Sequence, residues 1–260
     1  MMNNIEKQKE HFNSIAFDYY SARQNSNTLL YKQLLWHYVF KHILPSSERV
    51  SVLEPMCGYA EGENIVKSHY CSNIEYTGFD YSEKLIDIVK QMHPEKNVFV
   101  QDVTTFRPVS KYDLIVIIGG LHHVPDYSDE VLRNLKDGLI EDGYLINFEP
   151  THGNIITKAI RDRIYRSNPI FDHLTERDYS VDELNKIYSG AGFEIAFQFY
   201  PGLLAYSLYY NPDVFPKLSR INPLLLKTLF VLEKPFYRTK IAKFFSFGTI
   251  TILKRKVVID

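Results

Sequence analysis

The chain has 260 residues, of which 45% are hydrophobic and 14% aromatic, and its formal net charge is -1. This composition is enough for one large core, and the near-neutral charge excludes the strongly basic character that nucleic-acid binding needs. The two cysteines, Cys57 and Cys71, form no C-x-x-C pair, and the polar N-terminus shows no secretory signal. We therefore expect a reduced, cytoplasmic, globular protein without a membrane span.

Residues 1–45 predict an N-terminal helical cap. Within 5–44, apolar side chains recur every three to four residues until Pro45 ends the run. The apolar positions are Leu29, Leu30, Leu34, Leu35, Val39 and Ile43.

Residues 48–150 alternate between strand and helix patterns, which predicts a parallel, doubly wound sheet. Asp142 and Gly143 predict a tight turn before the fifth strand. The predicted strands are 50–54, 74–79, 97–101, 112–118 and 143–149, and the predicted helices are 61–69, 82–92 and 128–139.

The C-terminal third adds two strands, at 193–199 and 247–256, and cap segments at 151–192 and 201–245. The second cap segment is rich in Tyr, Phe, Leu and Pro and does not read as sheet core. The sequence thus predicts an α/β fold of one domain, 1–260, with a Rossmann-like, doubly wound, mostly parallel seven-stranded sheet. A helical cap precedes this sheet, and an inserted cap precedes its last strand.

The run V-L-E-P-M-C-G-Y-A-E-G at 52–62 joins a buried strand to a turn of small residues. Glu54 ends the first strand, Asp80 the second, and Asp102 follows the third. Because the carboxyl ends of parallel strands meet at one edge of a sheet, we expect all three acids to face one crevice. Such a crevice suits a cationic ligand that carries a ribose, and it disfavours a pyrophosphate.

E-P-M-C-G-Y-A-E-G resembles the first motif of class I S-adenosylmethionine-dependent methyltransferases. Y-D-L-I-V-I-I-G-G-L-H-H-V at 112–124 and L-K-D-G-L-I-E-D-G-Y-L-I at 135–146 resemble the family's later motifs, so that the likeness covers about 48–150. H-F-N-S-I-A-F-D-Y-Y at 11–20 resembles its opening helix, in which an aromatic near Tyr19 or Tyr20 covers the cofactor.

The resemblance implies S-adenosylmethionine as the cofactor, with Asp80 on the ribose hydroxyls and Asp102 near the adenine. Met56 and Ala60 stand where the family usually has glycine, and Met56 is expected to avoid positive φ. The residues expected to bind the cofactor are Tyr19, Glu54, Met56, Gly58, Asp80, Tyr81, Asp102, Val103 and Gly119.

His122 and His123 follow the fourth strand, where an imidazole can act as a general base for a methyl acceptor. Glu149 ends the fifth strand and is expected to orient a histidine or to accept a substrate hydroxyl. The pattern resembles small-molecule and sugar O-methyltransferases, which favours His122 as the base with Glu149 in support. No metal is expected, because His122, His123, Glu149 and His152 lack the close spacing of metal motifs.

The cap segments predict a small-molecule, sugar or glycolipid acceptor. Tyrosines at 206, 209 and 210 and arginines at 161, 163 and 166 suit a sugar that carries a phosphate, but the pattern favours a solvated basic face over an ordinary hydrophobic core. The stretch 223–245 leaves a peripheral membrane contact open, and nothing in the sequence indicates the oligomeric state. Three alternatives also stay open: N-methylation by proximity, a NAD-dependent oxidoreductase, and a cofactor-binding protein without catalysis.

Overall fold

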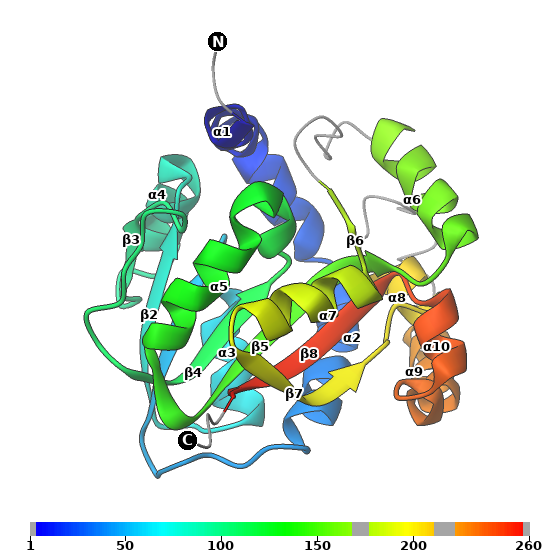
Figure 1. The fold of residues 1–260 in the computed structure, drawn as a ribbon. Helices are drawn as coiled ribbons and strands as arrows, with labels where there is room; N and C mark the ends of the chain where they lie inside the picture. The colour runs from blue at the N-terminus through cyan, green and yellow to red at the C-terminus, as the bar shows by residue number, and fades with distance from the viewer. Residues whose placement is uncertain (1–3, 168–176, 211–221, 257–260) are drawn as a thin grey trace.

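The structure is a computed structural model that describes residues 4–167, 177–210 and 222–256. Seven strands form the main sheet in the order β3-β2-β1-β4-β5-β8-β7, and the short β6 pairs with the end of β5 (Figure 1). The first five strands run parallel, and β8 is antiparallel to both β5 and β7. The predicted Rossmann-like, mostly parallel sheet is therefore confirmed. The strands are β1 (Val50–Pro55), β2 (Ile74–Asp80), β3 (Val98–Val100), β4 (Tyr112–Ile118), β5 (Leu139–His152), β6 (Tyr179–Ser180), β7 (Phe193–Phe199) and β8 (Gly248–Arg255).

Helices cover both faces of the sheet, with α5 and α7 on one face and α2 and α3 on the other (Figure 1). Each face has its own buried cluster: Trp36 and Val66 belong to one, and Leu132 and Leu184 to the other. None of the helices in the described part of the chain is long and apolar enough to cross a bilayer. The helices are α1 (Asn4–Arg23), α2 (Ser26–Phe40), α3 (Glu61–His69), α4 (Glu83–Met92), α5 (Ser128–Asp137), α6 (Ile155–Ser167), α7 (Val181–Gly190), α8 (Leu204–Tyr209), α9 (Pro223–Glu233) and α10 (Lys240–Phe245). The described residues also include three single turns of 3-10 helix: η1 (Leu121–His123), η2 (Pro125–Tyr127) and η4 (Lys234–Phe236).

The N-terminal cap consists of two helices, so the prediction of one run over 5–44 is wrong. Asn25 is extended (φ -60, ψ 128), and its side chain accepts from the backbone N–H groups of Asn27 and Thr28. A side chain that satisfies the first free N–H groups of a helix starts a new helix at that point. The chain therefore breaks at Asn25, and α2 is free to pack at a different angle from α1.

Strand β5 begins at Leu139, four residues before the predicted start, and extends to His152. Its pairing with β4 shifts between Tyr112 and Leu114, so the Asp142-Gly143 turn becomes an irregularity inside the strand. The longer strand carries Glu149 within the sheet, opposite Thr249 of β8.

Candidate functional site

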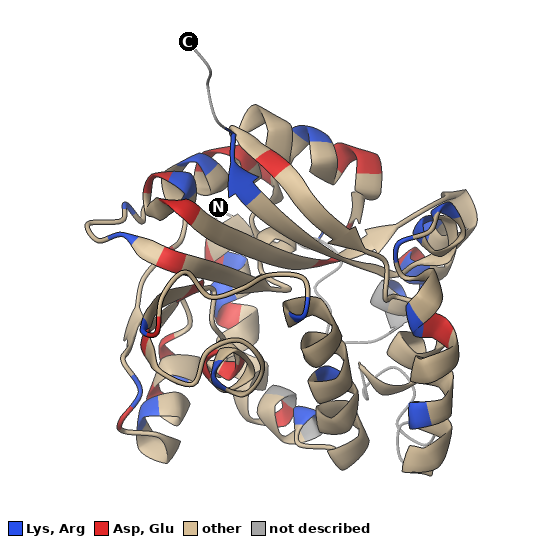
Figure 2. Cartoon of the chain, turned by 90° about the horizontal axis from the view of Figure 1, so that it is seen from below, with Lys and Arg blue, Asp and Glu red and all other residues tan. Residues whose placement is uncertain are grey.

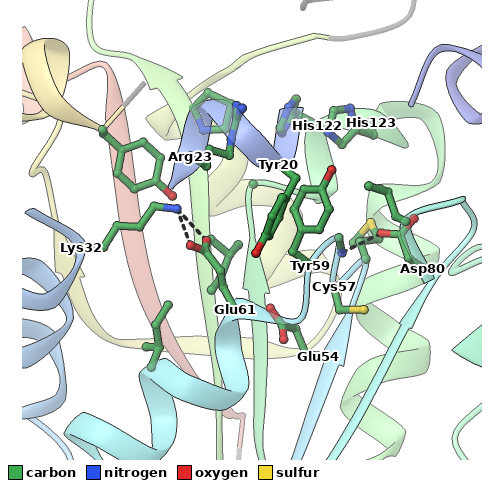
Figure 3. Close-up of a pocket in the computed structure, with 18 of the residues that line it drawn as sticks. Tyr20, Arg23, Lys32, Glu54, Cys57, Tyr59, Glu61, Asp80, His122 and His123 are labelled. Atoms are coloured by element: carbon green, nitrogen blue, oxygen red, sulfur yellow. Dashed lines mark hydrogen bonds and ion pairs between the residues drawn. The ribbon is translucent and has the colours of Figure 1, made fainter. Parts of the chain in front are cut away.

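A cavity of about 680 Å³ lies at the carboxyl edge of the parallel strands, where the sequence predicts the crevice. The loops after β1, β2, β3 and β4 form one side of it, and α1, α2, α6 and α8 contribute the other (Figure 3). We call these the cofactor side and the cap side. β1, β2 and β4 each pair with two neighbouring strands, so the polar groups at their ends are held in place by the sheet.

The loop after β1 has left-handed backbone at two residues that are not glycine. Met56 and Ala60 both have φ 55, and Gly58 has φ 50. The expectation that Met56 avoids positive φ is therefore wrong. Left-handed backbone costs an L-residue roughly 1–2 kcal/mol, and such strain persists where the surroundings hold it. The buried Lys96 supplies part of that hold, because its Nζ donates to the Ala60 carbonyl at 2.7 Å.

Glu54 is a buried carboxyl at the base of the cavity. It accepts from Gly62 N at 3.0 Å and from the Tyr76 hydroxyl at 2.5 Å. A Cβ at position 62 would lie 2.6 Å from the carboxyl carbon, so any other residue there would displace the Glu54 side chain. Burial raises the pKa of Glu54 to about 8, although both of these donors lower it.

Asp80 ends β2 and turns its carboxylate back toward the β1 loop (Figure 3). Its two oxygens accept from Gly58 N and from Ser82 N, each at 2.9 Å. Burial raises the pKa of Asp80 to about 6. Asp102 also lines the cavity and accepts from the backbone and hydroxyl of Thr104, both at 2.8 Å.

Eight of the nine residues expected to bind the cofactor line this one cavity. They are Glu54, Met56, Gly58, Asp80, Tyr81, Asp102, Val103 and Gly119. The ninth, Tyr19, has a side chain outside the described part of the structure. Its neighbour Tyr20 lines the cavity and packs on Tyr59 with ring centroids 4.7 Å apart.

The residues at these positions fit S-adenosylmethionine. By its chemistry, the Asp80 carboxylate suits ribose hydroxyls and the Glu54 carboxyl suits a cationic amino group. At Gly58 an added Cβ would meet nothing within 4 Å, so open space adjoins the loop backbone. Tyr59 and Tyr20 place flat apolar surface over the same region.

His122 and Glu149 meet at the end of β4. The His122 Nδ1 lies 2.8 Å from a carboxylate oxygen of Glu149, and the imidazole lines the cavity. Glu149 is fully buried and is not among the lining residues, so it contacts the histidine and not the cavity. Its oxygens also accept from three successive backbone N–H groups, those of Gly120, Leu121 and His122. One carboxyl therefore fixes both the loop and the ring.

Burial is the main influence on the ionisation of this pair. It lowers the pKa of His122 to about 3, and Arg161 lowers it further while Asp178 raises it. Burial also raises the pKa of Glu149 to about 8, against the three N–H donors. The imidazole is consequently neutral at physiological pH, and a Nδ1–H bond to Glu149 leaves the Nε2 lone pair available.

His123 also lines the cavity, but its ring is enclosed by aromatic neighbours. Its centroid lies 3.9 Å from that of His122 and 4.9 Å from that of Phe12, which it meets edge to face. Burial and the neighbouring histidines His122 and His11 lower its pKa well below the usual value. The structure thus brings both histidines to the cavity, with only His122 held by a carboxylate.

Two ion pairs on the cap side were not anticipated from the sequence. Lys32 of α2 donates to both oxygens of Glu61, at 2.5 and 2.7 Å (Figure 3). Arg161 of α6 lies 3.3 Å from Asp178, and its guanidinium donates to Thr151 O at 2.9 Å. A signal for Lys32 was present, because it falls at i+1 of the buried stripe Tyr31, Leu35 and Val39 of α2. A lysine buried next to such a stripe needs an acidic partner to balance its charge, and in this structure the partner is Glu61.

The other cap residues noted in the sequence divide between the cavity and the surface. Arg161, Tyr206 and Tyr210 line the cavity, whereas Arg163 and Arg166 are exposed. In the described part of the chain, no group of three or more His, Cys, Asp or Glu side chains is arranged to hold a metal ion. His152 pairs instead with Asp178 at 2.7 Å.

Comparison with known proteins gives a family match and several structural matches. Residues 56–145 match the family model of a methyltransferase domain. No curated protein sequence matches the chain.

Among solved structures, an O-methyltransferase from a trans-AT PKS multienzyme of Brevibacillus brevis, in complex with S-adenosyl-L-homocysteine, is 16% identical. That match has a TM-score of 0.56 and covers 86% of this chain and 72% of the other. The putative methyltransferase solved with the Trm112 activator of Haloferax volcanii is 13% identical, with a TM-score of 0.61 and coverage of 95% and 98%. The [4+2]-cyclase SpnF is 15% identical, with a TM-score of 0.59 and coverage of 86% and 82%.

These structural matches show a shared fold, and the family match covers the loops that form the cofactor side. Residues 56–145 contain the left-handed loop, Asp80, Asp102 and His122, which are the groups that the cavity brings together. Residues 56–145 thus carry a methyltransferase domain, and the residues that line the cavity fit S-adenosylmethionine as its cofactor.

Proposed function

We propose that this enzyme methylates a hydroxyl group of a small molecule, sugar or glycolipid in the cytoplasm, with His122 as general base and Glu149 as its positioning residue. The observation that carries the proposal is the 2.8 Å contact between His122 Nδ1 and Glu149, with the ring facing the cavity beside the cofactor loop. Both cysteines are free thiols, which suits a reducing compartment.

The reaction places one demand on the protein beyond alignment of the reactants. The bound cofactor supplies an electrophilic methyl group on a sulfonium, which becomes a neutral thioether when the methyl leaves. As the acceptor oxygen bonds to carbon, it must lose its proton. The neutral His122 can take that proton at Nε2, and Glu149 at Nδ1 stabilises the imidazolium that forms.

Glu149 offsets a cost that burial imposes. Burial keeps the His122 imidazole neutral but also makes it a weak proton acceptor. The carboxyl in contact with Nδ1 compensates when it is ionised, because a negative charge there favours the protonated ring. Its pKa of about 8 places this effect in the mildly alkaline range. Removal of Glu149 should therefore weaken the base even where the ring stays in place.

The cap side supports an acceptor with apolar surface and hydroxyl groups. Tyr206 and Tyr210 stack with centroids 4.9 Å apart and line the cavity together with Phe247. Lys32 and Arg161 are already paired with acids, so the cap does not require a charged acceptor. Aromatic faces of this kind suit sugar rings and acyl chains, and an acceptor borne by a lipid would bring the enzyme to a membrane surface.

The first experiment is calorimetric titration with S-adenosylhomocysteine and, separately, with NAD. We expect binding of the former alone, and binding of NAD alone would overturn the proposal in favour of a hydride transfer. The next experiment measures S-adenosylhomocysteine formation with a panel of hydroxyl acceptors. We expect His122→Ala to lower kcat about 10²–10⁴-fold while the affinity for S-adenosylhomocysteine is kept.

His93→Ala provides a matched control, since His93 also lines the cavity but lies on the loop after α4. It should keep kcat close to that of the wild type. If His122→Ala also keeps its kcat and an amine acceptor is methylated, N-methylation by proximity replaces the proposal. The likeness to the [4+2]-cyclase SpnF makes the turnover measurement necessary, because this fold alone does not define a reaction.

A further inference from the structure

Helices α6, α9 and α10, with the η4 turn between the last two, lie together on one side of the molecule (Figure 1). We call this surface the α6/α9/α10 face. Many of the large apolar side chains that the described structure exposes belong to it. Contiguous apolar exposure of this kind indicates a surface that meets another body.

Helix α9 is apolar on two opposite stripes. Leu226 and Phe230 point into the core and are buried. Leu224, Val231 and Leu232 point outward and are 66%, 55% and 62% exposed. A helix that only covers a soluble core would carry polar residues on the outward stripe.

Helix α10 and the start of α6 continue this surface. Ile241 and Phe245 are 64% and 56% exposed on α10, and Ile155 is 82% exposed on α6. The two helices adjoin, because the side chain of Asn154, the residue before α6, donates to Phe244 O of α10 at 2.6 Å. The exposed apolar residues of the three helices thus come from adjoining elements.

The charges on this face are almost all positive. Residues 223–245 contain five basic residues and one acid. Lys227, Arg238 and Lys240 are exposed, and the basic positions of these helices can be followed in Figure 2. The one acid, Glu233, turns inward, where its oxygens accept from Ala205 N at 3.1 and 3.2 Å. In a chain of net charge -1, this face therefore presents cations among apolar side chains.

We propose that the α6/α9/α10 face docks on an anionic lipid bilayer. Leucine, isoleucine and phenylalanine side chains would enter the acyl boundary, and the lysines and arginine would meet lipid phosphates. A protein partner fits less well, because protein interfaces are depleted in lysine, whereas lysine stems extend along a bilayer surface with their charges in the headgroups.

Helix α6 connects this surface to the reaction site. Ile160 and Ile164 line the cavity, while Ile155 and Ile156 on the same helix face outward. Docking would therefore place one wall of the cavity against the bilayer. This step rests on the proposed function and narrows its acceptor to a hydroxyl compound carried by a lipid.

The test is co-sedimentation of the full chain with vesicles of phosphatidylcholine alone and of phosphatidylcholine mixed with phosphatidylglycerol. We expect binding to the mixed vesicles at low salt, and weak binding to the neutral ones. Raising NaCl to ~0.5 M should reduce binding to the mixed vesicles, because salt screens the lysine and phosphate charges. No binding to either kind of vesicle would overturn the proposal.

Two pairs of variants locate the surface. Leu232→Glu with Phe236→Glu should lower vesicle binding about tenfold or more, and Val109→Glu, which changes a fully exposed apolar residue far from this face, should not. Lys227→Glu with Lys240→Glu should also lower vesicle binding about tenfold or more. The control Lys90→Glu on α4 should leave vesicle binding unchanged. Equal losses in variants and controls would show that the vesicles bind elsewhere and would overturn the proposal.

Two further readouts separate this proposal from its rival and from the proposed function. If the wild type is a dimer in sedimentation and the face variants are monomers without any change in vesicle binding, the face is a contact between two copies of this chain and the bilayer proposal fails. The face variants should bind S-adenosylhomocysteine as the wild type does. Failure of the wild type to bind it would count against the proposed function alone.

Discussion

The two sides of the cavity hold their charged groups in different ways. On the cofactor side, Glu54 and Asp80 are buried acids that accept hydrogen bonds from N–H and O–H donors, and neither belongs to an ion pair among the described residues. On the cap side, Lys32 pairs with Glu61 and Arg161 pairs with Asp178. The cofactor side thus has acids without a protein cation to offer a ligand, whereas the charges of the cap side are paired before any ligand binds.

This difference indicates that the cofactor side recognises its ligand by charge, whereas the cap side encloses its ligand. A site that keeps acids out of water without a cation is preorganised for a cationic ligand, which gains the interaction without rearranging the protein. A site whose charges are already paired recognises its ligand mainly through shape and apolar contact. We therefore expect substitutions on the cofactor side to act on cofactor affinity, and those on the cap side to act on stability and on the acceptor.

The largest expected effect is that of Asp80→Asn on binding of S-adenosylhomocysteine. Loss of the charged acceptor for the ribose should weaken binding on the order of 100-fold, about 3 kcal/mol. Calorimetry measures it directly. Lys32→Met on the cap side is the matched control and should leave the affinity within about threefold. Equal losses in the two variants would remove the distinction between the sides.

The next effect is on the pH dependence of stability. The pKa values of Glu54 and Glu149 are raised to about 8, so the folded protein holds these protons more tightly than the unfolded chain does. Their stabilisation is complete below the unfolded pKa near 4.5 and is lost as the pH rises toward 8. Between pH 6.5 and 8 we expect a fall in the free energy of unfolding on the order of 2 kcal/mol.

The depressed pKa of His122 acts in the opposite sense, but only between about pH 3 and 6.5, so it does not disturb this window. Chemical denaturation of the free protein at several pH values gives the slope. Glu54→Gln removes the titrating proton while its amide oxygen still accepts from Gly62 N, and it should flatten the slope by about half. A slope that is unchanged in this variant would show that Glu54 is ionised throughout.

A smaller effect is expected from the ion pair of the cap side. Lys32→Met leaves Glu61 partly buried without its partner and should lower the free energy of unfolding by roughly 1 kcal/mol. The double variant Lys32→Met with Glu61→Leu should recover most of this loss, since both charges are then removed. If the double variant is less stable than the single one, the pair contributes more than the cost of burying its charges.

The smallest effect is that of Ala60→Gly in the cofactor loop. Glycine relieves the left-handed backbone of position 60 but makes the unfolded chain more flexible, so that we expect a net stabilisation between about 0 and 1 kcal/mol. Ala159→Gly on α6 is the control. At an exposed helical position with ordinary backbone it should destabilise by roughly 0.5–1 kcal/mol. Destabilisation of similar size in both variants would contradict strain at Ala60.

The sequence predicts the cofactor side because local rules determine it. Strand ends, a small-residue turn and an acid after each strand follow one another within a few residues, and a parallel sheet brings them to one edge. One expectation on this side, that Met56 avoids positive φ, was wrong. The steric preference of a single residue predicts negative φ, but the packing of the whole loop imposes φ 55. The contacts of Lys96 come from residues about 36 positions away, which no local pattern encodes.

The cap side was less predictable because it depends on packing between distant helices. Lys32 and Glu61 are 29 residues apart, and Arg161 receives its position from carbonyl groups of β5 and of the segment before β8. The sequence did identify Arg161, Tyr206 and Tyr210, but it could not assign their neighbours. The contact of His122 with Glu149 was of intermediate predictability. His122 follows β4 and Glu149 lies near the end of β5, and these adjacent parallel strands bring both residues to the same edge of the sheet.

The buried acid at position 54 also couples cofactor binding to protons in solution. A carboxyl with a pKa of about 8 holds its proton near neutral pH, and a cationic group placed beside it lowers that pKa. Binding of an amino acid ammonium should therefore release part of a proton to the buffer. The measured enthalpy would then change with the ionisation heat of the buffer chosen, and the affinity would increase with pH while the stability of the free protein decreases. A Glu54→Gln protein should bind without that exchange.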